Sequence, residues 1–223
     1  MKKIGPLTLS LVLLGFVPLW CVLTTAQAAD SSAAVKLPQP VFEGKVSVEK
    51  ALKERRSVRS YKAEPLSMGE VAQILWAAQG VTDASKGLRT APSAKAAYLI
   101  EVYLVAGNVT GLPAGLYKYQ PGRHELARIF EGDAKEKLFS AAGQAPIRNA
   151  PAALVIAGYP KRSVNPGWIY LEAGHASENV YLQAVSLGIG TVAMAGFKPD
   201  DVKKAMNFTE EELPIYIMPL GKK

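Results

Sequence analysis

The chain has 223 residues, of which 49% are hydrophobic and 20% are charged. This length and composition fit one globular domain with a sizeable core and exclude a low-complexity or fibrous chain. The formal net charge is +7. This positive charge favours an anionic ligand. Because no lysine- and arginine-rich block is long enough for a nucleic-acid-binding arm, we expect no nucleic-acid partner.

The first 28 residues have the features of a secretory signal peptide. Lys2 and Lys3 precede an apolar run, and Ala26-Gln27-Ala28 offers small residues for cleavage after Ala28. The alternative is an uncleaved anchor, although the run is short for a bilayer and prolines interrupt it. No twin-arginine pair is present, so we expect Sec-type export to the periplasm or beyond, without stable membrane insertion after cleavage.

Cleavage would also change the chemistry of the chain. It removes two lysines, no acidic residue and the only cysteine, Cys21, which leaves a net charge of +5. Trp20 stands directly before Cys21, where a lipoprotein needs a small residue, so a lipid anchor is not expected. The mature protein would have neither a disulfide nor a thiol.

A single domain over 47–223 is predicted after a flexible leader over 29–46. Capping residues and hydrophobic spacing predict helices over 48–54, 68–79, 134–139 and 167–187, and a helix that begins at 199. β-Branched and apolar runs predict strands over 98–106, 116–119, 126–130, 152–158, 191–194 and 215–220. Since these elements do not repeat strictly as βαβ, the predicted fold class is α+β, a mostly antiparallel central sheet flanked by helices.

Three of these segments have a more specific prediction. Pro121 and Gly122 lie between two paired strands and favour a type II turn. The helix over 167–187 is rich in alanine, glycine and serine, which suits a buried or subunit-facing position. Residues 81–93 are expected to form a loop.

The densest functional signal is the stretch Glu54-Arg55-Arg56-Ser57-Val58-Arg59-Ser60-Tyr61. Three guanidinium groups so close together favour an anion beside them, and arginine presents a planar fork of donors that fits phosphate. The hydroxyl of Ser57 can donate a further hydrogen bond. The alternative, from these residues alone, is a solvated basic helix end.

Metal and hydrolytic sites are not indicated, and we expect no metal. His124 and His175 have no second histidine or cysteine at ligand spacing. Glu172 and His175 share a helical face, but a single Glu-x-x-His pair is weak support for a di-metal site. Gly188-Ile189-Gly190 lacks the spacing of a dinucleotide fingerprint, and no serine lies in a nucleophile elbow.

Two loops gain interest beside the arginine stretch, although each alone is an ordinary loop. Ala91-Pro92-Ser93-Ala94 precedes a predicted strand, and Ala195-Gly196-Phe197 follows one. Gly196 would let the backbone approach a flat ligand closely.

Together these segments resemble the nitroreductase family of flavin enzymes, and within it the azoline dehydrogenase-like, SagB-type branch. The similarity runs from about Lys50 to Gly221. Its motifs are Arg55-Arg56-Ser57-Val58-Arg59-Ser60-Tyr61, Ala91-Pro92-Ser93-Ala94 with the strand after it, Gly111-Leu112-Pro113-Ala114-Gly115-Leu116-Tyr117-Lys118-Tyr119, Gly174-His175-Ala176-Ser177-Glu178-Asn179 and Leu187-Gly188-Ile189-Gly190-Thr191. Each motif is loose, but five in family order are fairly specific.

The resemblance implies a nitroreductase-like fold with a long dimer-forming helix and noncovalently bound FMN at two sites in a homodimer interface. It implies that Arg55, Arg56 and Ser57 hold the FMN phosphate and that Arg59 lies near the pyrimidine edge of the ring. The implied activity is transfer of hydride or electrons between FMN and a small unsaturated substrate, such as a nitro compound or a quinone.

The other implied contacts surround the flavin ring. Pro92, Ser93 and Ala94 would line the ring, while Gly196, preceded by Ala195, would face flavin N5, where hydride is transferred. Lys222 or Lys223 would replace the basic C-terminal arm that many nitroreductases have, unless the terminus is solvated.

Departures from the family pattern leave alternatives open. Lys95 stands where relatives often have glycine, and Ala195 stands where many have an acidic residue. No catalytic Lys-Tyr pair of the azoline dehydrogenase kind can be placed, so a SagB-type dehydrogenase and a non-catalytic flavin-binding module remain alternatives. NAD(P)H is the usual family reductant, but it is scarce outside the cytoplasm, so the electron donor stays open.

Overall fold

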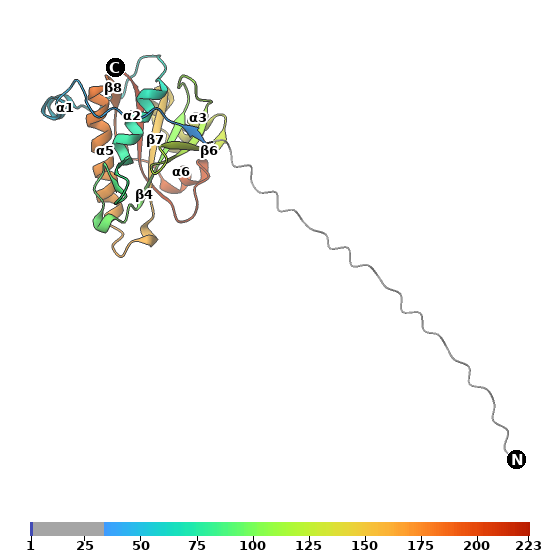
Figure 1. The fold of residues 1–223 in the computed structure, drawn as a ribbon. Coiled ribbons are helices and arrows are strands. Elements are labelled where there is room, and N and C mark those ends of the chain that lie inside the picture. The colour runs from blue at the N-terminus through green and yellow to red at the C-terminus, as the bar shows by residue number, and fades with distance from the viewer. Residues whose placement is uncertain (2–33) are drawn as a thin grey trace. The chain divides into compact units, whose positions relative to one another are not determined.

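The computed structural model describes Met1 and residues 34–223, so the predicted signal peptide lies outside the described residues apart from Met1 (Figure 1). The helices are α1 (Val48–Glu54), α2 (Met68–Gln79), α3 (Ala134–Ala142), α4 (Ala145–Asn149), α5 (Trp168–Ser186) and α6 (Pro199–Ala205). Two short 3₁₀ segments are η1 (Ala94–Ala96) and η2 (Pro160–Arg162). None of the helices described is long and apolar enough to cross a membrane.

A seven-stranded sheet forms the centre of the domain, with the order β1-β6-β5-β4-β7-β9-β8 and antiparallel pairing throughout. Its strands are β1 (Val35–Lys36), β4 (Ile100–Ala106), β5 (Gly115–Gln120), β6 (Glu125–Glu131), β7 (Ala152–Gly158), β8 (Ile189–Thr191) and β9 (Leu213–Lys222). A separate small hairpin pairs β2 (Val81–Asp83) with β3 (Leu88–Arg89). The predicted α+β architecture, a mostly antiparallel central sheet flanked by helices, is confirmed.

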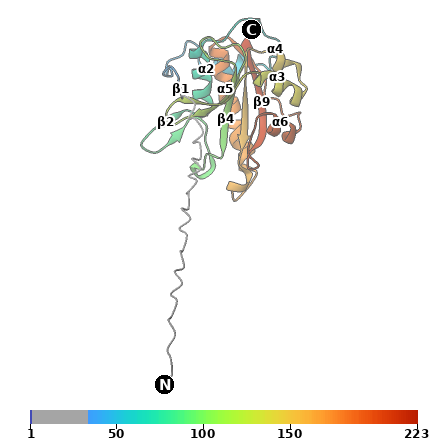
Figure 2. The same ribbon diagram turned by 90° about the vertical axis from the view of Figure 1, so that its right-hand side faces the viewer.

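The sheet is covered on both faces (Figure 2). One face packs against α2 and α5, and the other packs against α3, α4 and α6. Alternate residues of β4 divide between the two cores: Val102 and Leu104 face α2, while Tyr103 and Val105 face the opposite side. All seven residues of β7 are buried, which explains its uninterrupted apolar sequence.

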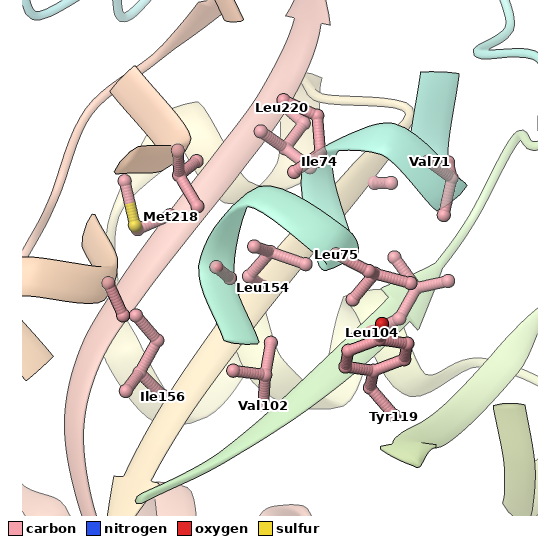
Figure 3. Packing of buried hydrophobic residues seen from close by; sticks show 14 of the residues in the cluster. Val71, Ile74, Leu75, Val102, Leu104, Tyr119, Leu154, Ile156, Met218 and Leu220 are labelled. Carbon is pink, nitrogen blue, oxygen red and sulfur yellow. The ribbon is translucent and has the colours of Figure 1, made fainter. Parts of the chain in front are cut away.

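Helix α2 closes the core on its side of the sheet. Figure 3 shows Val71, Ile74 and Leu75 of α2 above side chains from β4, β5, β7 and β9. The spacing of these three residues puts them on one helical face. A capping box fixes the start of the helix, because Ser67 accepts the Glu70 N–H while the Glu70 carboxylate accepts the Ser67 N–H.

Part of the predicted flexible leader is attached to the domain. Val35 pairs with Leu126 in β6, and the side-chain amide of Gln73 exchanges two hydrogen bonds with the backbone of Val41 (2.8 and 3.0 Å). Residues 35–41 therefore add an edge strand and a crossing segment, which the polar, proline-bearing sequence did not indicate.

The connection between β5 and β6 differs from the predicted type II turn. That turn would need a positive φ at Gly122, but the positive φ occurs at His124 (51°) instead. The His124 ring is held on both sides, since Nδ1 lies 2.8 Å from the Tyr119 hydroxyl and Nε2 donates to the Pro38 carbonyl (2.9 Å). The residue with left-handed backbone is therefore His124, two positions after the predicted Gly122, and its ring contacts hold it there.

Three smaller differences concern element boundaries. The predicted loop over 81–93 contains the β2–β3 hairpin, and α4 lies in a region with no predicted element. The strand predicted over 191–194 covers Ile189–Thr191, after which Met194 forms an isolated bridge with Ile217 of β9.

The arginine stretch runs along the β8 end of the sheet. Ser57 forms a parallel bridge with Thr191, and the Val58 N–H donates to the Thr191 carbonyl (2.9 Å). Further along, the Lys62 N–H donates to the Lys222 carbonyl (3.0 Å). Residues that are far apart in sequence thus meet at one sheet edge.

Two glycines make this contact possible. A Cβ on Gly190 would lie 2.6 Å from Val58 Cγ1, and a Cβ on Gly221 would lie 2.7 Å from Tyr61 Cβ. Contacts this short require the backbone to move apart. Any larger residue at either position would therefore push the arginine stretch away from the sheet.

We predict that Gly190→Ala and Gly221→Ala each destabilise the domain by about 1–3 kcal/mol, the usual cost of overpacking a well-packed contact. Chemical denaturation would measure this change in the free energy of unfolding. Gly69→Ala is the matched control, because a Cβ there meets nothing within 4 Å. Equal stability of all three variants would contradict the close packing described.

Candidate functional site

Tyr181 connects the arginine stretch to the chain just before the Gly196 loop. Its hydroxyl lies 3.2 Å from Ser57 Oγ of the arginine stretch. The same oxygen accepts the backbone N–H of Ala193 (2.8 Å), three residues before Gly196. Tyr181 is only 8% exposed, so one buried side chain of α5 holds both segments together.

Arg55 lies over the same tyrosine. Its guanidinium carbon is 5.0 Å from the centre of the Tyr181 ring, within the range of a cation–π interaction. Glu178, one turn earlier on α5, forms a loose ion pair with Arg55 (3.9 Å). Ser57 and Arg59 are exposed, so this short segment presents a hydroxyl and guanidinium groups to solvent.

Tyr61, at the end of the arginine stretch, packs against Gly221 of β9. Burial raises the pKa of Tyr61, an effect increased by nearby Tyr181 and opposed by Arg59. The phenol therefore stays protonated and donates to the Val58 carbonyl (2.8 Å). This bond folds the stretch back on itself and leaves Arg59 between its two anchored ends.

Two basic side chains predicted to contact phosphate have other partners. Arg56 donates to the Lys53 and Arg55 carbonyls (3.0 and 2.7 Å), at the carboxyl end of α1. Lys222 pairs with Glu70 of the α2 capping box. Burial alone would raise the pKa of Glu70, but hydrogen bonds from Lys222 and Ser67 outweigh it and lower that pKa. Lys222 thus stabilises the join between β9 and α2.

The Gly196 loop is open. Ala195 and Gly196 are exposed, and a Cβ on Gly196 would meet only Gln144 Nε2, at 3.8 Å. Gln144 fixes the loop by donating to the Gly196 carbonyl (3.0 Å). A hollow of about 210 Å³ lies beside the loop, lined mainly by apolar and aromatic residues: Tyr170, Ala195, Phe197, Pro199, Leu213, Pro214, Ile215 and Tyr216.

The loop that contains Ser93 is held by Glu172 of α5. Ser93 Oγ donates to Glu172 Oε2 (2.7 Å) and accepts the Tyr98 N–H (2.8 Å). The same carboxylate oxygen accepts the Leu99 N–H (3.1 Å). His175 Nδ1 donates to the Pro92 carbonyl (3.0 Å), which adds a second attachment to α5.

The backbone of this loop is strained. Lys95, Ala96 and Tyr98 all have positive φ (54°, 52° and 47°). A non-glycine residue with positive φ is uncommon, and such strain persists only where surrounding contacts determine the conformation. The contacts from Glu172 and His175 provide that constraint.

Within one chain the predicted site residues form two groups. Arg55, Ser57 and Ala193, which leads into the Gly196 loop, contact Tyr181, whereas the Ser93 loop contacts Glu172. Both anchors are on α5, nine residues apart, which is about 13 Å along a helix. Within one chain Tyr181 therefore links the arginine stretch to the segment that precedes the Gly196 loop, while the Ser93 loop is held at a separate place on α5.

Sequence reasoning missed the two anchors. Tyr181 is an isolated aromatic residue in the second half of a helix rich in small and apolar residues, a pattern typical of core. Glu172 was noted only as half of a weak Glu-x-x-His metal motif. The Glu172 side chain is only 2% exposed. Because a buried carboxylate is costly unless hydrogen-bond donors surround it, this burial indicates that Glu172 has specific donors.

Comparisons with known proteins agree on one family. The nitroreductase family model matches residues 52–222. A Methanocaldococcus jannaschii protein assigned as a nitroreductase is 38% identical over 185 residues, covering 80% of this chain and 92% of the relative.

Solved structures give the same result. A Ralstonia eutropha JMP134 protein assigned as a nitroreductase has a TM-score of 0.76 and 29% identity, covering 86% of this chain and 90% of that one. A Desulfovibrio desulfuricans protein, also assigned as a nitroreductase and solved in complex with FMN, shares the fold at 17% identity. Its TM-score is 0.60, with 78% of this chain and 84% of that chain covered. The chain belongs to the nitroreductase family of oxidoreductases.

Proposed function

We propose that this protein is an exported, FMN-dependent oxidoreductase that transfers hydride or electrons between flavin and a small unsaturated substrate. The observation that carries the proposal is the hydrogen-bonded link from Ser57 through Tyr181 to Ala193. It ties a segment rich in anion donors to the chain three residues before an open glycine loop, an arrangement that suits a ligand with a phosphate at one end and a flat ring at the other.

The donor set fits a phosphate. Arg55 offers a planar guanidinium, and the exposed residue Ser57 near it offers a hydroxyl that is anchored by Tyr181. Charge-assisted hydrogen bonds from such groups are among the stronger ones in proteins. Arg59, two residues on and exposed, adds positive charge farther along the same edge.

The Gly196 loop suits the ring end of the cofactor. Its exposed backbone and missing side chain allow a planar group to approach closely. When bound, FMN supplies the hydride-accepting and hydride-donating atom, and the protein orients the ring and the substrate. The adjacent hollow, lined by Tyr170, Phe197 and Tyr216, has room for a small apolar or aromatic substrate.

A homodimer would complete the site. Leu171, His175 and Glu178 form an exposed stripe along α5. If two copies pack along this stripe with a two-fold axis near the middle of α5, Glu172 of one copy comes to the level of Tyr181 in the other. The Ser93 loop held by Glu172 would then reach the site organised by Tyr181 in the opposite copy.

The apolar surface next to α5 supports the same arrangement. A groove of about 480 Å³ lies between α1, α2 and α5 and includes Trp76 and Leu182. Near it, Phe42, Val48 and Leu52 are 77%, 63% and 55% exposed. Exposed apolar residues gathered in this way are typical of surfaces that a partner covers.

We predict that Arg55→Ala weakens FMN binding by about 1.5–3 kcal/mol, the usual contribution of a charge-assisted hydrogen bond. Quenching of flavin fluorescence in a titration of the apo-protein would measure the change. Arg123→Ala is the matched control: it removes the same charge at the β5–β6 turn, near the opposite edge of the sheet. If both variants bind FMN like the wild type, the phosphate is not held by Arg55.

Turnover separates an oxidoreductase from a flavin-binding module. We predict that FMN bound to the protein, once reduced with dithionite, is reoxidised rapidly by a nitroaromatic compound or a quinone. Stopped-flow absorbance of the flavin gives the rate, and free reduced FMN with the same acceptor is the control. Reoxidation no faster than that of free flavin would favour a storage role. The same assay with NADH or NADPH in place of dithionite tests the electron donor.

Export and assembly are tested on protein purified from the producing cells. We predict that its intact mass corresponds to a chain beginning at Ala29 and that light scattering gives the mass of a dimer. Cell fractionation should place it outside the cytoplasm. A full-length chain that remains with the membrane would indicate an uncleaved anchor, and a monomer that binds FMN tightly would contradict the shared site.

A further inference from the structure

We infer that Tyr181 is a positioning residue that turns Ser57 into a hydrogen-bond donor toward a bound phosphate. This inference rests on the proposed function, because it concerns how the same site recognises the phosphate end of its cofactor. Three contacts carry it: the Ala193 N–H on the tyrosine oxygen, the tyrosine oxygen on Ser57 Oγ, and the Arg55 guanidinium over the tyrosine ring.

The direction of the hydrogen bonds follows from the chemistry of the groups. A backbone N–H can only donate, so the Tyr181 oxygen accepts from Ala193. The phenolic hydrogen of Tyr181 then needs an acceptor, since its side chain is buried. Ser57 Oγ, 3.2 Å away, is the acceptor that the described residues provide.

This direction determines what Ser57 offers to a ligand. Once its oxygen accepts from Tyr181, the hydroxyl hydrogen of Ser57 is free to point away from the protein. Ser57 is an exposed residue, so its hydroxyl hydrogen is available to an anion that binds there. A phosphate oxygen can only accept, and it meets a hydroxyl already arranged to donate.

Tyr181 also positions the charged neighbour of Ser57. The Arg55 guanidinium lies over the aromatic ring rather than extending into solvent. Holding a long side chain in one place before binding reduces the entropy lost when the ligand arrives. The phenol hydroxyl and the ring therefore act on two different phosphate donors, and the two effects can be separated by mutation.

Tyr181→Phe removes the hydroxyl and keeps the ring. We expect the affinity for FMN to fall about tenfold, which corresponds to about 1.4 kcal/mol, while the affinity for riboflavin, which has the same ring but no phosphate, stays unchanged. Titrations of the apo-protein with each flavin, followed by fluorescence quenching, measure both. In a Ser57→Ala background, Tyr181→Phe should have little further effect, because the hydroxyl acts through Ser57.

Tyr117→Phe is the matched control. It removes the hydroxyl of a buried tyrosine that donates to the Pro113 carbonyl (2.8 Å) in another part of the domain, and it should leave both flavin affinities unchanged. If Tyr181→Phe folds poorly, Ser57→Ala alone still tests the inference. The residue is exposed, and its loss should lower FMN affinity without lowering riboflavin affinity.

The possible outcomes separate this inference from the proposed function. Equal losses of FMN and riboflavin affinity in Tyr181→Phe would show that the tyrosine only supports the fold, and unchanged FMN affinity would show that its hydroxyl does not act on the phosphate. Wild-type protein that binds the two flavins equally would overturn the inference and leave FMN-dependent chemistry standing. Wild-type protein that binds neither flavin would overturn both.

Discussion

The structure depends on the contact between residues 57–62 and the β8–β9 edge of the sheet. Two backbone hydrogen bonds and two close glycine contacts hold an irregular segment against regular strands. The segment has little regular structure of its own, so its conformation is imposed by the edge it meets. Without this contact, the guanidinium groups of the arginine stretch would have no fixed relation to the Gly196 loop.

Helix α5 holds the loops that surround the candidate site. Its buried face belongs to the core, yet two of its buried residues are polar or amphipathic and reach outward to loops. Glu172 accepts from Ser93 and Leu99, and Tyr181 joins Ser57 to Ala193. The same helix thus stabilises the fold, fixes two loops and, in the proposed dimer, brings one loop to the other copy.

The sequence was sufficient wherever the signal was local. The bounds of β7 and α1 agree with prediction, because an apolar run and a serine cap are readable in a few residues. Strand β1 was missed because its two residues are held by a partner 91 positions later, Leu126. The predicted type II turn at Gly122 was wrong for a similar reason, since the residue with positive φ is His124, whose ring contacts Tyr119 and Pro38.

The candidate site divides in the same way. Arg55, Ser57 and Gly196 could be proposed from motifs, because phosphate binding and close approach select residue types. The partners that organise them could not, because a tyrosine or a glutamate on a helix looks the same whether it fills space or holds a loop. Lys222 shows the opposite case. A basic residue near the terminus suggests an anionic ligand, but in the folded protein Lys222 forms an ion pair with Glu70 instead.

The separation of Ser57 and Tyr181 by 124 positions in the sequence has a consequence for biogenesis. Strands β8 and β9, which receive the arginine stretch, follow it in the chain, so a nascent chain that has not reached them holds no arranged set of phosphate donors. Cofactor capture is thereby tied to completion of the fold. For the export that we propose, this order would be an advantage, because a chain that crosses a membrane unfolded could not bind its coenzyme before the crossing is complete.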